Sequence, residues 1–474
     1  MVFSSNIFLF AFLPVTLAGY YLINQRLRNA FLLLMSLLFY AWGEPRVVLV
    51  MMGSIIINYL GGLAIHATMK DGRHSFLNKL IMFLTVAVNL LILFYYKYFD
   101  FFITTTNGIF GTSIPLRNIV LPIGISFFTF QGMSYVLDVF MGHAGVQKNP
   151  LNIALYIALF PQLIAGPIVR YADVNLQIDN RSCDIKKFAE GIRRFAVGLV
   201  KKMLLANTAA LTADSIFNEP VGTVTTAAAW LGALCYAVQI YFDFCGYSDM
   251  AIGLGKMFGF DFLENFNYPY IARNITDFWR RWHISLSSWF RDYVYIPLGG
   301  NRRGNRYFNL SVVFLLTGMW HGASWNYILW GIWHGIFSIV EKPLLKRDFY
   351  KKVPYPITWL FTMLIVLIGW VLFRLENLSE ALKYLGVMFG AVRPDNVAYT
   401  FEWFFNGKLA AVLACAVLAS VPWKNILGHI PALKRFGDSS FCHLLQNAAT
   451  VALLLLGVVL CMTSTYNPFI YFRF

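Results

Sequence analysis

Long hydrophobic runs separated by short polar segments dominate the chain from end to end. A helix of about 20 apolar residues crosses the ~30 Å hydrocarbon layer of a bilayer. Several runs are short or interrupted by proline and glycine, as at 122–124 and 166–167, which is typical of re-entrant segments. The pattern predicts an all-α polytopic membrane protein with about ten to twelve transmembrane helices plus re-entrant and interfacial helices. The runs lie at 3–23, 29–42, 47–69, 80–103, 119–140, 152–169, 191–217, 227–252, 307–320, 323–340, 356–373, 408–422 and 443–463.

One stretch, 277–291, has hydrophobic residues at helical spacing on one side only. Arginines and serines occupy the other side, and Thr276 or Asp277 can cap the start of the helix. This periodicity predicts a single amphipathic helix that lies in the cytoplasmic membrane interface with its aromatic residues at headgroup depth. The apolar stripe would consist of Phe278, Trp282, Leu286, Trp289 and Tyr293.

The composition supports a membrane protein. Of 474 residues, 58% are hydrophobic and only 13% are charged, against about 25% charged in a soluble domain. The run at 3–23 lacks the basic start and small-residue cleavage site of a signal peptide, so it is predicted to be the first spanning helix. Without a visible internal repeat, we expect one transmembrane domain over 1–474, with its core motifs at about 120–340 and an aromatic tail at 466–474.

The charges predict an orientation and exclude a nucleic-acid partner. The net charge of +15 comes from loops such as 70–79, 273–306 and 342–352, which are rich in lysine and arginine, whereas 203–255 has neither. In a multi-pass protein such loops remain in the cytoplasm, so the excess charge needs no nucleic acid to explain it. The N-terminus is then expected outside.

Two histidines, His321 and His334, lie within the tryptophan-rich apolar sequence GMWHGASWNYILWGIWHG at 318–335. On one continuous helix they would be ~20 Å apart, too far to share a metal ion. No HExxH motif is present, and no acidic residue occurs between 293 and 340. The sequence therefore predicts no metal site.

The chemistry that remains is general base catalysis by histidine in a site that excludes water. His321 would take a proton from a hydroxyl while a bound thioester supplies the acyl group. Gly318 and Gly322 leave room for a ligand there, and Trp320 and Trp325 supply apolar walls. The alternative for each histidine is a satisfied residue of the core, which is the interpretation we adopt for His334.

A set of motifs along the whole chain resembles the membrane-bound O-acyltransferase family, and within it the bacterial branch that O-acetylates alginate-type polysaccharides. The motifs are MVFSS at 1–5, YAW at 40–42, LPIGISF at 121–127, FPQLIAGP at 160–167, YFDFCGYSD at 241–249, FWRRWH at 278–283, WHGA at 320–323 and FIYFRF at 469–474.

The resemblance implies a ring of helices with a cytoplasmic and an extracytoplasmic funnel that meet at the catalytic histidine. The invariant histidine of the family falls on His321, and a second functional histidine falls on His283. It also implies acetyl-CoA or another acyl thioester as donor substrate, no permanently bound cofactor, and the cytoplasmic (inner) membrane of a bacterium as location. Lipids surround such a protein, and the acyl group passes to an SGNH-hydrolase-like partner that modifies an extracytoplasmic polysaccharide.

Donor binding is assigned to residues near the two histidines. Arg280 and Arg281 precede His283 and could hold phosphates of the donor, while tryptophans would line its path. The tryptophans are Trp279, Trp320 and Trp325.

The aromatic tail at 466–474 is predicted to insert into the protein or the membrane interface. Tyr471 is a possible acyl carrier there, because a phenol with a pKa near 10 forms an ester that transfers its acyl group readily.

Two other functions fit parts of the sequence. An acyltransferase for a lipid or a protein would use the same histidines. A transporter or flippase would need ionisable residues within several spans, for which Asp138, Asp243 and Asp249 are the candidates.

Overall fold

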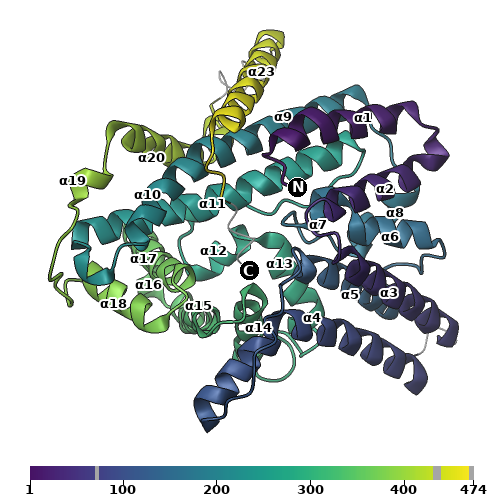
Figure 1. The fold of residues 1–474 in the computed structure, drawn as a ribbon, viewed down its shortest axis with the longest axis horizontal. Helices are drawn as coiled ribbons and strands as arrows, with labels where there is room; N and C mark the ends of the chain where they lie inside the picture. Colours follow the sequence, from purple (N-terminus) through teal and green to yellow (C-terminus); the bar gives the residue numbers. More distant parts are fainter. Residues whose placement is uncertain (70–73, 431–438, 469–474) are drawn as a thin grey trace. The chain divides into compact units, whose positions relative to one another are not determined.

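The computed structural model describes residues 1–69, 74–430 and 439–468, and every predicted hydrophobic run contains helix (Figure 1). The first half comprises η1 (Phe8–Phe12, a π-helix), α1 (Leu13–Leu22), η2 (Gln25–Leu27), α2 (Arg28–Ala41), α3 (Val48–Thr68), α4 (Phe76–Phe110), α5 (Ile125–Met141), α6 (Pro150–Ala158), α7 (Phe160–Leu163), α8 (Tyr171–Asp179), α9 (Ile185–Val200), η3 (Lys201–Ala206, a π-helix), α10 (Asn207–Phe217) and η4 (Val221–Thr223). The second comprises α11 (Thr226–Met257), η5 (Pro269–Ile271), α12 (Ile275–Arg281), α13 (Ile284–Phe290), η6 (Arg291–Tyr295, a π-helix), α14 (Arg306–His321), α15 (Trp325–Leu344), α16 (Asp348–Lys352), α17 (Tyr355–Arg374), α18 (Leu378–Met388), α19 (Phe401–Phe404), α20 (Gly407–Ala419), α21 (Trp423–Leu427) and α23 (Ser440–Thr463).

Among the described residues, six helical segments are long and apolar enough to cross a bilayer, and shorter apolar helices accompany them. The predicted all-α, multi-pass membrane protein is therefore confirmed. The predicted total of ten to twelve crossings and the ring with two funnels stay predictions. The six segments are Val48–Thr68, Phe76–Phe110, Ile185–Phe217, Thr226–Met257, Tyr355–Arg374 and Ser440–Thr463.

The chain divides into two compact units. The first unit comprises Met1–Phe195 and Met250–Leu263, and the second comprises Ala196–Asp249 and Glu264–Phe474. The single domain predicted for 1–474 stays a prediction.

Polar side chains join helices inside the first unit. Asn58 on α3 and Asn89 on α4 are fully buried and exchange two amide hydrogen bonds, each 3.0 Å long. Reciprocal bonds of this kind hold helices together where neighbouring lipid offers no hydrophobic driving force.

One buried and one partly buried ion pair join helices inside the second unit. Lys202 Nζ on η3 lies 2.6 Å from Asp243 Oδ1 on α11. Lys201 Nζ lies 2.7 Å from Asp249 Oδ2, six residues further along α11. Two of the three carboxylates that a transporter would need are thus committed to helix packing. In the first unit, the carboxylate of Asp138 accepts the backbone N–H of Ala172 at 2.8 Å.

Close helix packing occupies the space that glycine was expected to leave for a ligand. A methyl group on Gly318 of α14 would overlap the carbonyl oxygen of Tyr327 on α15, and one on Gly322 would overlap the Tyr327 ring. The prediction of ligand space at these two glycines is wrong, because they let α14 and α15 approach each other instead.

The predicted amphipathic helix at 277–291 is wrong in three respects. It is broken into α12, α13 and η6, and Asn274 caps its start by accepting the N–H of Asp277 at 2.7 Å. Its apolar stripe faces the protein interior rather than lipid headgroups. Phe278 and Trp282 are buried, and the Trp282 ring centroid lies 4.8 Å from that of Trp370 on α17.

Candidate active site

The break between α12 and α13 falls on His283, whose φ of 44° is in the left-handed region. A non-glycine residue pays about 1–2 kcal/mol for this conformation, so the surroundings must hold it. An extended segment does so from both sides. The backbone N–H of Ile284 donates to Asn265 O, and that of Asn267 donates to Arg281 O, both at 2.9 Å. These backbone bonds therefore fix the position from which the His283 side chain projects.

The side chain of Asn265 determines which nitrogen of His283 carries the proton. Asn265 Oδ1 lies 3.3 Å from the backbone nitrogen of Ser285, 2.8 Å from Ser285 Oγ and 3.0 Å from His283 Nδ1. A backbone N–H can only donate, so the shared atom must be the amide oxygen. His283 Nδ1 is then the protonated nitrogen, and Nε2 keeps the lone pair. The amide nitrogen of Asn265 donates to Ser248 Oγ at 3.0 Å.

His283 is neutral over the physiological pH range. Its side chain is fully buried, and burial lowers its pKa to about 3. Among the residues that the structure describes, Nε2 has no hydrogen-bond partner. An oriented, uncharged imidazole with an unused lone pair is chemically a base.

His321 is the last residue of α14 and is 3% exposed. Aromatic rings surround it edge-on, with centroid distances of 4.9 Å to Trp330, 5.0 Å to Trp320 and 5.2 Å to Phe373. The ring of Trp320 also lies 5.8 Å from that of His283. The structure thus brings both predicted histidines together around one predicted tryptophan.

The remaining predicted wall residues are placed differently. Trp279 packs against Trp330 at 5.6 Å and against the fully buried His334 at 5.3 Å, between ring centroids. Trp325 starts α15 and is 52% exposed. The ring against His321 from α15 is Trp330, which the sequence pattern did not single out. The available signal was the spacing of Tyr327, Trp330 and His334 along one face of that helix.

The two predicted donor-binding arginines differ in their surroundings. Arg281 forms an ion pair with Asp277, 2.8 Å between Nε and Oδ1, and donates to Asn267 O at 3.2 Å. Arg280 is exposed and forms no ion pair with the described residues. Arg280 is therefore the arginine available to a charged ligand.

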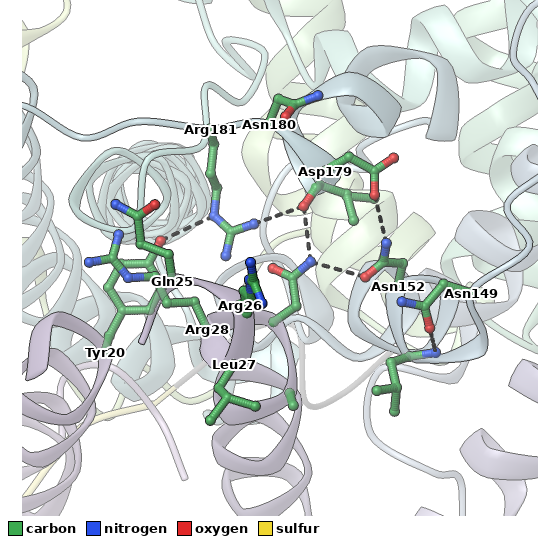
Figure 2. Close-up of a pocket in the computed structure, with 14 residues that line it drawn as sticks. Tyr20, Gln25, Arg26, Leu27, Arg28, Asn149, Asn152, Asp179, Asn180 and Arg181 are labelled. Carbon is green, nitrogen blue, oxygen red and sulfur yellow. Dashed lines mark hydrogen bonds between the residues drawn. The ribbon is translucent and has the colours of Figure 1, made fainter. Parts of the chain in front are cut away.

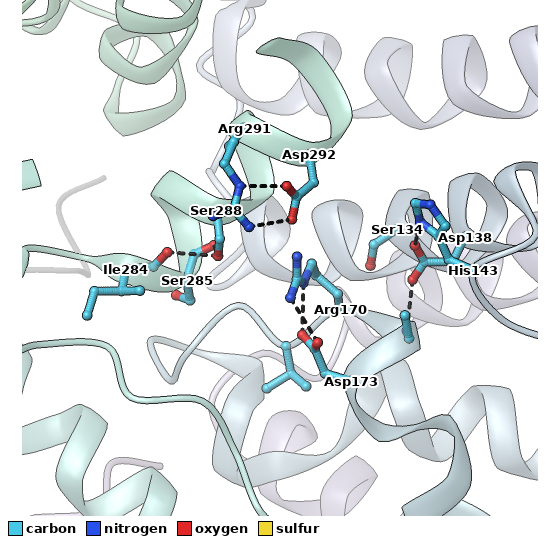
Figure 3. A network of polar contacts seen from close by, with 12 residues as sticks. Ser134, Asp138, His143, Arg170, Asp173, Ile284, Ser285, Ser288, Arg291 and Asp292 are labelled. Carbon is cyan, nitrogen blue, oxygen red and sulfur yellow. Dashed lines mark hydrogen bonds and ion pairs between the residues drawn. The ribbon is translucent and has the colours of Figure 1, made fainter. Parts of the chain in front are cut away.

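A small cavity of about 200 Å³ lies in the second unit beside these helices. Its walls come from α12, α13, η6 and α14, and Thr317 of α14 lies one turn before His321. Arg291, at its edge, is paired with Asp292 at 2.7 Å, and Ser288 Oγ donates to Ile284 O at 2.8 Å (Figure 3). The apolar lining residues are Trp279, Leu286, Phe290, Leu310, Val313 and Phe314.

The predicted acyl carrier Tyr471 lies outside the described residues. The segment before it packs on the second unit: Lys202 Nζ donates to Pro468 O, and Asn207 Nδ2 donates to Tyr466 O at 3.3 Å. The hydroxyl of Tyr466 donates to Asp214. Residues 466–468 thus lie against protein, and insertion of the tail as a whole stays a prediction.

No group of three or more histidine, cysteine or acidic side chains within the described ranges could hold a metal ion. The residue missed by the sequence pattern was Asn265, since an asparagine in the loop sequence ENFNYP carries no periodic or motif signal.

Comparison with known proteins identifies the family. The family described as MBOAT, membrane-bound O-acyltransferase family, matches residues 140–376, which include Asn265, His283 and His321. A probable alginate O-acetylase of Pseudomonas putida is 48% identical over 395 residues, covering 82% of this chain and 80% of the relative. The peptidoglycan O-acetyltransferase of Helicobacter pylori is 34% identical across the whole chain and 98% of the relative. A teichoic acid D-alanyltransferase of Bacillus subtilis is 33% identical over 235 residues, 45% of this chain and 57% of the relative. The chain belongs to the membrane-bound O-acyltransferase family and is an O-acyltransferase.

Proposed function

We propose that this protein moves an acetyl group from acetyl-CoA, at the cytoplasmic side of a bacterial inner membrane, toward the O-acetylation of an extracytoplasmic polysaccharide. A partner enzyme of the SGNH-hydrolase type completes the transfer. Two relatives that match most of this chain are named as a probable alginate O-acetylase and a peptidoglycan O-acetyltransferase. These names support acetyl as the acyl group and a polysaccharide as the acceptor. The observation that carries the proposal is the pair of buried histidines around Trp320.

In the proposed reaction, His321 accepts the proton of an incoming hydroxyl as its oxygen attacks the thioester carbonyl. The C–S bond breaks, and the proton passes from the imidazole to the departing thiolate of coenzyme A. His283 remains neutral throughout, and its Nε2 accepts a hydrogen bond from a reacting group. The aromatic rings around His321 exclude water, which would otherwise hydrolyse the thioester.

The donor is proposed to approach by way of Arg280. A guanidinium without a carboxylate partner suits the phosphates of coenzyme A. The cavity of about 200 Å³ that Trp279 helps to line has the size and the apolar walls to hold part of the pantetheine arm.

The test is transfer of labelled acetyl from acetyl-CoA in membranes that contain the partner enzyme and the polysaccharide. His321→Ala should lower transfer by about 10²–10⁴ while the protein remains inserted. His443→Ala is the matched control, because His443 is an exposed histidine of α23. Transfer near the wild-type level in His321→Ala would refute the proposal, and label in lipid or protein in place of polysaccharide would replace the acceptor class.

A further inference from the structure

A second polar site lies wholly within the first unit and shares no residue with the histidine site (Figure 2). It is an open pocket of about 400 Å³ between the end of α1, η2, the starts of α2 and α6, and the end of α8. Volumes of this size hold small-molecule ligands. The loop at 24–28, which forms one wall, faces the cytoplasm in the predicted orientation.

The pocket carries a surplus of positive charge. Arg26, Arg28 and Arg181 line it, against one carboxylate, Asp179. That carboxylate accepts a hydrogen bond from Asn152 Nδ2 at 2.7 Å. In the described parts of the chain, none of the three arginines forms an ion pair with an acidic residue. Like charges gathered without counterions repel one another, which an anionic ligand would relieve.

Two of the arginines are held in place and still have N–H groups that donate to no other described residue. The Arg28 guanidinium lies 4.8 Å from the centroid of the Tyr20 ring, and its Nε is buried with no hydrogen-bond partner among the described residues. Arg181 lies 4.4 Å from the Phe260 ring and donates to Tyr20 Oη at 3.2 Å and to Ile178 O at 3.1 Å. Arginines that serve only to retain a loop in the cytoplasm need no such aromatic and backbone support.

The rim of the pocket is apolar and exposed. Leu27 and Leu151 line it and are 53% and 48% exposed. Exposed leucines beside a cationic pocket match a ligand with a charged head and hydrocarbon chains. We propose that this pocket binds the phosphate-bearing headgroup of an anionic phospholipid, with the planar guanidinium groups of Arg28 and Arg181 on the phosphate.

The experiment measures lipid binding to the purified full chain in detergent by native mass spectrometry. Phosphatidylglycerol should bind the wild type more tightly than phosphatidylcholine. The double variant Arg28→Gln with Arg181→Gln should lower phosphatidylglycerol affinity about ten-fold or more, since charge-assisted hydrogen bonds are lost. The control, Arg302→Gln with Arg303→Gln, removes the same charge from an exposed loop and should leave affinity unchanged.

Further arms identify the source of the phosphate. Displacement of phosphatidylglycerol by millimolar inorganic phosphate or coenzyme A in the wild type would overturn the lipid assignment. Equal losses of affinity in the double variant and the control would overturn the site itself. If the double variant does not fold, Arg28→Lys replaces it: it keeps the charge and removes the planar fork, and it should weaken phosphatidylglycerol binding. Wild-type affinity in Arg28→Lys would then refute the proposal.

Discussion

Replacing Asn265 should impair acyl transfer although its side chain forms no part of the predicted donor path. Asn265 Oδ1 accepts His283 Nδ1–H at 3.0 Å, and this bond keeps the lone pair on Nε2. A neutral hydrogen bond contributes about 0.5–1.5 kcal/mol net. Since 1.4 kcal/mol is about a factor of ten in an equilibrium, Asn265→Ala should reduce the competent tautomer and kcat by about two- to ten-fold. The assay is acetyl transfer per mole of folded protein.

A second variant separates positioning from mere stability. Asn265→Asp keeps an acceptor for His283 and for Ser285, so kcat should recover near neutral pH. Its carboxylate, however, favours the imidazolium and raises the pKa of His283 from its value of about 3. Because protonation of Nε2 removes the base, activity should decline with falling pH from a higher midpoint than in the wild type.

Asn267→Ala is the control for both variants. Asn267 is exposed, and its contacts with Arg281 use backbone atoms that alanine retains. It should behave as the wild type. The reasoning is refuted if Asn265→Ala has wild-type kcat, or if Asn265→Asp shows an unchanged pH profile.

An exposed arginine, a buried ion pair and the C-terminal tail can each be tested by substitution. Arg280→Glu should raise the KM for acetyl-CoA several-fold, and this rise should shrink at high salt because the guanidinium is exposed. An unchanged KM would mean that Arg280 serves only to keep its loop in the cytoplasm. Lys202→Met removes the ammonium group that lies 2.6 Å from the buried Asp243 carboxylate, so it should destabilise the protein by about 3–5 kcal/mol. Adding Asp243→Leu should restore much of the loss in detergent melting curves. Tyr471→Phe should abolish polysaccharide acetylation, whereas Tyr466→Phe, which loses one hydrogen bond to Asp214, should not; equal activities would leave the tail as an anchor.

The helices could be predicted from the sequence because one physical constraint acts on nearly every residue. A backbone in hydrocarbon must satisfy its own hydrogen bonds, so hydrophobic length translates directly into helix, as at Val48–Thr68 and Tyr355–Arg374. The interruption predicted at 166–167 also followed from local chemistry, since α7 ends at Leu163 and α8 begins only at Tyr171.

Features that depend on tertiary contacts were not predictable in the same way. Helical periodicity through 277–291 gives no sign of a break, because the left-handed φ of His283 is stabilised by the distant segment that contains Asn265. Likewise, whether Trp325 or Trp330 faces His321 depends on how α15 crosses α14. That crossing is set by the contact of Gly318 with Tyr327, which periodicity along one helix does not encode.

The break at His283 links backbone geometry to the proposed chemistry. On a continuous helix, Ser285 N–H would bond to the carbonyl four residues earlier, and Asn265 Oδ1 would have only side-chain donors. In the observed turn, that N–H points to Asn265 Oδ1 and thereby identifies it as the oxygen. The same segment therefore stabilises both the turn and the tautomer. Its backbone bonds at Asn265 and Asn267 offset the conformational cost at His283, and the Asn265 side chain leaves the neutral imidazole with its lone pair on Nε2. His283→Gln bears the same left-handed cost as histidine, and its amide can still donate to Asn265, so it should remain folded and yet lack acyl transfer because an amide is not a base. His283→Gly relieves the strained turn but empties the fully buried imidazole site, so it should lack acyl transfer and also be less stable than His283→Gln; near-wild-type transfer in His283→Gln would refute the role of the lone pair.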